Sequence, residues 1–329
     1  MSVDQVVGIP RGLYYYVYYP FWKSFFDYLS TKTIISSPTN RSILDKGVKF
    51  SVDDICVSVK CYHGHVKDLL DNQDIDYVFV PRIVREAKGK HSCPKLIALP
   101  DLIKNAFVKY KDRIIEGNFY FGYRPKLILN EFLKIGRTLG ASDIKIKKAY
   151  RYAKNSFREF LNIKFKGYNF LQALDLWEGK EVEKKERSDI LIGISGFPYD
   201  VYDEFLNGGL LVKLKALSVD FISSDMIPAN ILKKQTKKLP KDLFWYQSNM
   251  ALKAGLYFLD RKDVQGVVVI SSFGCGLSAI YTKLLELYNK RVTKKPLMII
   301  TIDEQTGDAG LQTRVEAFID MIRMKRGDL

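Results

Sequence analysis

Cysteine is scarce in this sequence, and no cysteine has a close partner. The 329 residues include four cysteines and no CxxC pair. Four cysteines are too few for a disulfide scaffold, and the common zinc and ferredoxin-like motifs need closely spaced ligands. In a cytosolic protein such cysteines are buried thiols, or metal ligands drawn from distant segments.

Phosphate-binding motifs and long apolar runs are absent as well. The sequence has no GxxxxGKS or GxxxxGKT loop and no complete GxGxxG after a first strand, which argues against P-loop, nicotinamide and flavin sites. No apolar run approaches the roughly 18 residues that span a bilayer. The N-terminus lacks the basic and apolar regions of a secretory signal. We therefore expect a cytoplasmic protein that does not enter the membrane.

Acidic residues are outnumbered, because 37 Asp and Glu stand against 52 Lys and Arg and give a formal net charge of +15. This excess favours an anionic partner: nucleic acid, a phosphate-bearing cofactor or an acidic protein. Apolar residues are plentiful. With 47% hydrophobic and 13% aromatic residues, the chain can bury the core of one large or two medium domains.

Short β-branched runs alternate with helical stretches along the chain. We predict strands at residues 5–9, 33–37, 77–80 and 95–99 in the first half, and at 189–194, 219–223, 266–271 and 297–302 in the second. Apolar spacing predicts helices at 21–29 and 204–217. Strands that alternate with helices form βαβ units, and continuous apolar strands are typical of parallel sheets buried on both faces.

The two halves of the sequence follow the same plan. The stretch VVGIP…FWKSFFDYLSTKTIISS matches LIGIS…DEFLNGGLLVKLKALSVDFISS in order and in approximate spacing. We therefore predict an α/β fold with two similar Rossmann-like domains, at 1–110 and 188–329, each with a mainly parallel sheet. A basic helical segment, 111–187, joins them and ends in a charge-rich linker. The functional site is expected in the cleft between the domains.

Cys275 lies in SSFGCG, a glycine-rich turn between a predicted strand and a helix-like stretch. A helix N-terminus favours the thiolate, which is the form that ligates metals and attacks electrophiles. Turns at the carboxyl ends of parallel strands are also where α/β proteins bind ligands. Gly274 and Gly276, on either side of the thiol, are the candidates for backbone contact with a cofactor.

Cys93 and Cys56 are the candidate partners of Cys275. Cys93 follows the run YVFVPR, the first-half counterpart of GVVVIS, so we expect Cys93 and Cys275 at similar places, facing each other across the cleft. Cys56 precedes a predicted helix. Three thiolates from distant segments suit a soft metal with an open coordination position. On these residues alone, the alternative that each cysteine is simply a small buried side chain stays open.

Several polar residues surround these cysteines in the sequence. His63, His65 and His91 lie within thirty residues of one another, and the first two are candidate acid–base or outer-sphere groups. Arg11 and Arg82 each follow a predicted strand, where a guanidinium can bind a carboxylate or phosphate. A structural role explains these four residues equally well: the histidines could be structural, and the arginines could form structural ion pairs.

The last predicted strand leads into ITIDEQTGDAG, where Glu304 is a candidate general acid or base. Asp308 in the same stretch is sufficiently explained as the cap of a helix that begins near Leu311. The aromatic cluster between Tyr14 and Trp22 favours a core or domain interface over a base-stacking surface.

Between residues 144 and 166 the sequence is strongly basic. Glu159 is the single carboxylate in this stretch, and the basic residues are Lys145, Lys147, Lys148, Arg151, Lys154, Arg158, Lys164 and Lys166. This stretch is a candidate face for nucleic acid or an anionic protein. A solvated helix face is the common alternative, and no nucleic-acid motif accompanies the stretch.

Taken together, these motifs resemble a known family. The motifs are GIPRGLYYYVYYPFW, SPTN, DDICVSVK…HGHV, YVFVPRIV…CPK, GFPYDVYDEFLNGGLL, SSFGCG and IDEQTGDAGLQTRVEAFIDMI. They are similar to those of the DUF2229 family, whose members are described as acyl-CoA dehydratase activase-related proteins or CoA protein activases. That family is related to the subunits of 2-hydroxyacyl-CoA dehydratase and benzoyl-CoA reductase.

The resemblance implies a cofactor and a partner. The related dehydratase subunits hold a [4Fe-4S] cluster by three cysteines and leave one iron open, and Cys56, Cys93 and Cys275 fall in the matching motifs. Cys61 matches no motif cysteine. Larger family members carry a fused actin-like ATPase, which this chain has no room for, so the activator would be a separate protein. Four cysteines allow one cluster per chain, or one shared in a homo- or heterodimer.

Three hypotheses follow. The chain is an iron–sulfur protein that passes a low-potential electron from an ATP-dependent activator to a substrate such as an acyl-CoA. Alternatively, it is a non-catalytic subunit that carries electrons or docks onto the activase. The third hypothesis, a basic two-domain protein that binds nucleic acid, is disfavoured because no nucleic-acid motif is present.

Overall fold

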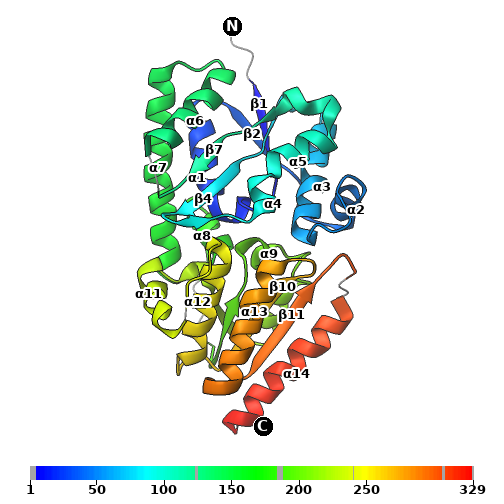
Figure 1. The fold of residues 1–329 in the computed structure, drawn as a ribbon, viewed down its shortest axis with the longest axis vertical. Helices are drawn as coiled ribbons and strands as arrows, with labels where there is room; N and C mark the ends of the chain where they lie inside the picture. The colour runs from blue at the N-terminus through cyan, green and yellow to red at the C-terminus, as the bar shows by residue number, and fades with distance from the viewer. Residues whose placement is uncertain (1–4, 123–124, 184–187, 240, 306–307, 328–329) are drawn as a thin grey trace. The chain divides into compact units, whose positions relative to one another are not determined.

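A computed structural model describes residues 5–122, 125–183, 188–239, 241–305 and 308–327 (Figure 1). The chain forms two compact units. The first comprises Met1–Asn162 with Phe244–Tyr246, and the second comprises Ile163–Leu243 with Gln247–Leu329. No helix in the described ranges is both long enough and apolar enough to cross a membrane.

The first unit is built on a four-stranded parallel sheet in the order β2-β1-β3-β6. Its strands are β1 (Val6–Ile9), β2 (Lys32–Ile35), β3 (Tyr77–Phe79) and β6 (Ile114–Ile115). A smaller sheet in the order β5-β4-β7 contains β4 (Arg82–Ala87), β5 (Lys90–His91) and β7 (Asn118–Tyr120). The helices are α1 (Tyr15–Tyr28), α2 (Arg41–Lys49), α3 (Val57–Asp71), α4 (Pro94–Ile97), α5 (Leu99–Ala106), α6 (Pro125–Thr138) and α7 (Asp143–Phe165).

The second unit also has a four-stranded parallel sheet, in the order β11-β10-β8-β9. Its strands are β8 (Ile190–Ser195), β9 (Val219–Ser223), β10 (Gly266–Ser272) and β11 (Leu297–Ile302). The helices are α8 (Phe170–Trp177), α9 (Pro198–Tyr202), α10 (Leu210–Ala216), α11 (Ala229–Lys233), α12 (Tyr246–Asp260), α13 (Gly276–Tyr288) and α14 (Asp308–Arg326). In Figure 1, α13 and α14 run beside the orange strands β10 and β11.

The two main sheets share one strand order. When the strands are numbered in chain order within each four-stranded sheet, both sheets run second, first, third, fourth. In such an order the chain leaves the first and third strands in opposite directions, which opens a crevice at their carboxyl ends. That crevice falls after β1 and β3 in the first unit and after β8 and β10 in the second. The α/β architecture with mainly parallel sheets is therefore confirmed.

The aromatic cluster between Tyr14 and Trp22 forms core, as the sequence predicts. Six of its rings are buried, and Tyr18 is half-buried. Trp22 and Phe26 on α1 meet Phe79 of β3 edge-to-face, at centroid distances of 5.3 and 5.5 Å. These contacts pack α1 against the sheet.

Three local expectations were wrong. Residues 95–99 form the end of α4 and the start of α5 rather than a strand, because Pro94 and Pro100 each occupy a first-turn position where proline favours a helix. The helix expected at 204–217 is confined to α10, since Gly208 and Gly209 adopt positive φ angles of 61° and 69° and interrupt it. The segment 111–187 is not wholly helical, because its β-branched pair Ile114–Ile115 pairs with β3 as β6.

Candidate functional site

The three candidate ligand cysteines share one structural position. Cys56 is the N-cap of α3, Cys93 of α4 and Cys275 of α13. All four cysteines of the chain are thiols rather than disulfides. Cys61 differs from the other three, because it lies inside α3 with 2% of its surface exposed. The backbone N–H groups at a helix start favour negative charge.

Cys56 and Cys93 belong to neighbouring segments of the first unit. Lys95, two residues after Cys93, donates from Nζ to the carbonyl oxygen of Asp54, two residues before Cys56, at 3.3 Å. Cys56 is buried and Cys93 is half-buried. Among the described residues, no three His, Cys, Asp or Glu side chains lie close enough together to hold a metal ion.

His63 lies on the same face of α3 as Cys56, because seven residues make two helical turns. Its Nδ1 donates to the Val59 carbonyl oxygen at 2.8 Å, so the proton of the neutral ring is on Nδ1. Burial lowers the pKa of His63, although the bond to Val59 acts in the opposite direction. In the part of the chain that the structure describes, Nε2 has no hydrogen-bond partner. Nε2 is therefore an available acceptor or ligand atom.

His65 points away from His63 and is held in the core. Its Nδ1 lies 3.0 Å from Ser36 Oγ, and its Nε2 lies 3.0 Å from Thr39 Oγ1. Ser36 Oγ also accepts the backbone N–H of Arg11 at 2.8 Å, so this network joins the loops after β1 and β2. Burial lowers the pKa of His65 to about 3. The two candidate histidines are thus not brought together, and the contacts of His65 favour the structural interpretation.

Acid should destabilise the protein partly through His65. Its pKa is lower in the folded chain than in the unfolded chain, so between pH 6.5 and 3 the unfolded state binds the extra proton. The contribution of His65 to the free energy of unfolding is therefore complete above pH 6.5. It falls on acidification by about 1.4 kcal/mol per pH unit. Urea unfolding of the wild type and His65→Gln across this range should show a shallower loss in the variant. Equal slopes would contradict this assignment.

The two candidate arginines differ in their contacts. The Arg82 guanidinium binds both carboxylate oxygens of Asp101, at 2.7 and 2.9 Å, and the Ile97 carbonyl oxygen at 2.6 Å. These contacts favour the structural ion pair for Arg82. Arg11 is half-exposed and lies over the Tyr15 ring at 5.9 Å, beside the loop that follows β1. Arg11 is therefore the better placed of the two for an anionic ligand.

A buried carboxylate network that the sequence did not reveal stands next to Cys93. Tyr14 Oη donates to Ser92 Oγ at 2.7 Å, and Ser92 Oγ donates to Glu86 Oε1 at 3.1 Å. All three side chains are buried. Burial and the neighbouring Glu86 carboxylate raise the pKa of Tyr14 well above its ordinary value. The network fixes the backbone immediately before Cys93.

In the second unit, the turn that contains Cys275 is also held by a buried serine that donates a hydrogen bond to a buried carboxylate. Ser272, the last residue of β10, donates from Oγ to Oδ2 of the fully buried Asp200 at 2.8 Å. Ser278 of α13 donates to the Cys275 carbonyl oxygen at 2.9 Å. Gly274 has a φ of +71°, which other residues adopt with strain, and it lets the chain reverse into α13. Asp200 lies in the GFPYD motif but was not singled out from the sequence.

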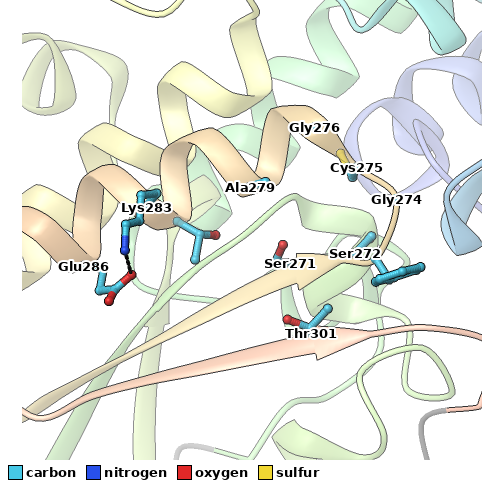
Figure 2. Close-up of a pocket in the computed structure, with 11 residues that line it drawn as sticks. Ser271, Ser272, Gly274, Cys275, Gly276, Ala279, Lys283, Glu286 and Thr301 are labelled. Atoms are coloured by element: carbon cyan, nitrogen blue, oxygen red, sulfur yellow. Dashed lines mark hydrogen bonds and ion pairs between the residues drawn. The ribbon is translucent and has the colours of Figure 1, made fainter.

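A groove of about 600 Å³ opens beside Cys275. Figure 2 shows Cys275 at the start of α13, with Ser271 and Thr301 on the strands below the helix. The far end is lined by Lys283 and Glu286, which form an ion pair at 3.0 Å. Gly276 leaves the near end open, because a Cβ at this position would meet no atom within 4 Å. The groove therefore leads along α13 to the thiol.

Glu304 lies in the turn after β11 and is half-exposed. The helix α14 begins at Asp308. The predicted cap by the Asp308 side chain lies outside the described part of the structure, as do residues 306–307. The role of Glu304 as an acid or base stays a prediction.

Comparison with known proteins agrees with the motifs. No curated protein matches the chain. The family model described as CoA enzyme activase uncharacterised domain (DUF2229) matches residues 6–227, which is more than half of the sequence. The match includes the Cys56 and Cys93 segments and the loop that holds Asp200. The chain therefore belongs to the DUF2229 family.

Proposed function

We propose that this chain is an iron–sulfur protein of the 2-hydroxyacyl-CoA dehydratase type, with one [4Fe-4S] cluster held by Cys56, Cys93 and Cys275. It would take a low-potential electron from a separate ATP-dependent activator of the actin-like fold and pass it to a bound substrate such as an acyl-CoA. The observation that carries the proposal is the common place of the three thiols, each at the start of a helix.

The donor set fits such a cluster. Thiolates are the usual protein ligands of iron–sulfur clusters, and a helix start stabilises the charge that a thiolate bears. Cys61, which the family motifs omit, is also the one cysteine that does not precede a helix. The identical strand order of the two main sheets supports the prediction that both units are Rossmann-like domains.

When bound, the cluster would supply one-electron transfer and an open iron that acts as a Lewis acid toward a substrate oxygen. The residues of this chain would position the cluster ligands and bind the substrate. The Tyr14–Ser92–Glu86 network holds the Cys93 loop, and Asp200 holds the Cys275 turn through Ser272. His63 offers Nε2 as a proton acceptor on the same face of α3 as Cys56.

Substrate would enter along the groove that leads to Cys275. Its walls combine apolar surface with the hydroxyl groups of Ser271, Thr282 and Thr301. An extended chain that carries amide groups, such as the arm of a CoA thioester, has the shape and polarity for such a groove. Arg11 is the cation placed for an anionic group of a ligand at the first unit.

A second function is favoured by one observation. Arg82 is engaged by Asp101, and His65 is locked by Ser36 and Thr39, so two of the candidate catalytic groups already have structural partners. A chain with fewer free catalytic groups suits a carrier that passes electrons to another protein. Under this alternative the same three cysteines hold the cluster, but no thioester is turned over.

The test is electron delivery by a purified activator of this family. With activator, ATP and a reductant, the visible absorbance of the cluster should bleach, and omission of ATP should leave it unchanged. A cluster whose absorbance does not respond to the complete mixture would contradict the proposed electron acceptance. Adding a candidate CoA thioester and assaying its product then separates the enzyme from the carrier.

A further inference from the structure

Three residues from far along the chain join the first unit beside the segment that precedes Cys93. Phe244–Tyr246 pack with the first unit, although Leu243 before them and Gln247 after them belong to the second. These residues, here called the 244–246 strap, lead directly into α12, which begins at the last of them. A segment that enters a unit for three residues and leaves it again is held there by what those residues contact.

The segment that precedes Cys93 is held only weakly by the small sheet. It contains β5, a strand of two residues that pairs with β4 in an irregular register. A turn with Gly89 at a φ of +69° joins the two strands. Hairpins of this kind are marginally stable in water on their own. The position of Cys93 therefore depends on further contacts, and the Tyr14–Ser92–Glu86 network is one of them.

The strap supplies the second set of contacts, and they converge on His91. Trp245 forms a parallel bridge with His91, on the side of β5 that β4 leaves open. The Phe244 ring stacks on the His91 ring at a centroid distance of 4.8 Å and an interplanar angle of 8°. Arg85 Nε donates to His91 Nε2 at 3.4 Å, so the imidazole is held at its edge as well as on its face. The strap therefore fixes both the backbone and the ring of the residue two positions before Cys93.

The third strap residue lies near the buried network. Burial and the nearby Glu86 carboxylate raise the pKa of Tyr246 to about 12. Tyr18 lies near the same two groups, because burial, Glu86 and Tyr246 together raise the pKa of Tyr18 well above its ordinary value. The strap thus meets both supports of the Cys93 segment, the β5 edge at His91 and the network at Glu86.

Burial in the core does not explain the place of Phe244. The residue is 56% exposed, so the hydrophobic effect contributes little to holding it. In the part of the chain that the structure describes, its ring lies against His91 and against Trp245, the latter edge-to-face at 5.7 Å. A ring that is kept at the surface on His91 acts on the segment before Cys93 rather than on the core.

We propose that Phe244 is a positioning residue for Cys93, and that the 244–246 strap holds the Cys93 segment in place by clamping His91. The inference rests on the proposed function, in which Cys93 is a cluster ligand. Ligands drawn from separate segments bind best when each is already held in its bound position, because less conformational freedom is then lost on binding. The strap provides this for the one candidate ligand that follows a two-residue strand.

The test uses the full chain without iron and iodoacetamide as the probe. Mass spectrometry follows the alkylation rate of each cysteine under reducing conditions, and hydrogen exchange is measured on the backbone amides of residues 88–93. Phe244→Ala removes the clamp, and Phe244→Tyr keeps a ring that can stack on His91. Phe165→Ala is the control, because Phe165, the last residue of α7, is also an exposed phenylalanine, at 45%.

In Phe244→Ala, Cys93 should be alkylated about tenfold faster than in the wild type and the amides of 88–93 should exchange faster, while the rate at Cys275 is unchanged. Phe244→Tyr should restore both wild-type rates, and Phe165→Ala should behave as the wild type. An unchanged Cys93 rate in Phe244→Ala would overturn the proposal. Faster alkylation with unchanged amide exchange would overturn it too, because the ring would then only cover the thiol. Iron content does not enter this test, so its failure and that of the cluster proposal are distinguishable.

Discussion

Replacement of Cys56, Cys93 or Cys275 by alanine is expected to remove the iron of the proposed cluster from the protein. Each substitution deletes one of three protein ligands, and the two that remain come from separate segments that cannot enclose the cluster. Anaerobically prepared variants should fall from about four irons per chain to nearly none. Iron and acid-labile sulfide analysis measures the loss, and circular dichroism verifies that each variant is folded.

Cys61→Ala is the matched control. Cys61 lies five residues from Cys56 and is more deeply buried, so its replacement perturbs the same helix without removing a proposed ligand. This variant should keep the iron of the wild type, with a modest loss of stability from the small cavity. Iron retained in any of the three ligand variants, or lost in Cys61→Ala, would contradict the ligand assignment.

Gly64→Ala should strongly destabilise the chain. Gly64 lies between the two histidines of α3, where α2 crosses so closely that a Cβ would stand 1.9 Å from the Ile43 carbonyl oxygen. The contact is reciprocal, because a Cβ on Gly47 would stand 1.9 Å from the Lys60 carbonyl oxygen. Backbone cannot move aside as a side chain does, so we expect a loss of about 3 kcal/mol in the free energy of unfolding.

Urea unfolding measures this loss, and Gly310→Ala supplies the comparison. Gly310 is also helical, in α14, but a Cβ there would meet nothing within 4 Å. Its replacement should stabilise the chain by about 0.5–1 kcal/mol, the ordinary gain of alanine over glycine in a helix. If Gly64→Ala unfolds at the same urea concentration as the wild type, α2 and α3 do not cross as closely as described here.

The strands of the second unit could be predicted because their signal is local. Residues 219–223 and 297–302 were predicted from β-branched runs and form β9 and β11 with the same bounds. Residues 95–99 are just as apolar, yet they are helical, because proline sets the first turns of α4 and α5. A short apolar run therefore predicts burial well, but its conformation is decided by the residues at its ends.

The site could be predicted only in part. The place of Cys275 before a helix followed from the order of strand, glycine turn and helix in the sequence. The groups that hold the cysteine loops had no such signal, because Asp200 and Ser272 are 72 residues apart. Tyr14 and Ser92 are 78 residues apart and meet only once the sheet has formed. His63 and His65 were both candidate acid–base groups, but side chains two residues apart on a helix point to nearly opposite faces.

The central claim, that this chain carries one cluster on three cysteines, is tested most directly by iron and sulfide analysis of the wild-type protein. The chain should be prepared and reconstituted under strictly anaerobic conditions, and the reduced sample examined by electron paramagnetic resonance. The account predicts a brown protein with about four irons and about four sulfides per chain and the signal of a reduced [4Fe-4S] cluster. A folded, colourless chain that retains no iron after reconstitution would contradict it.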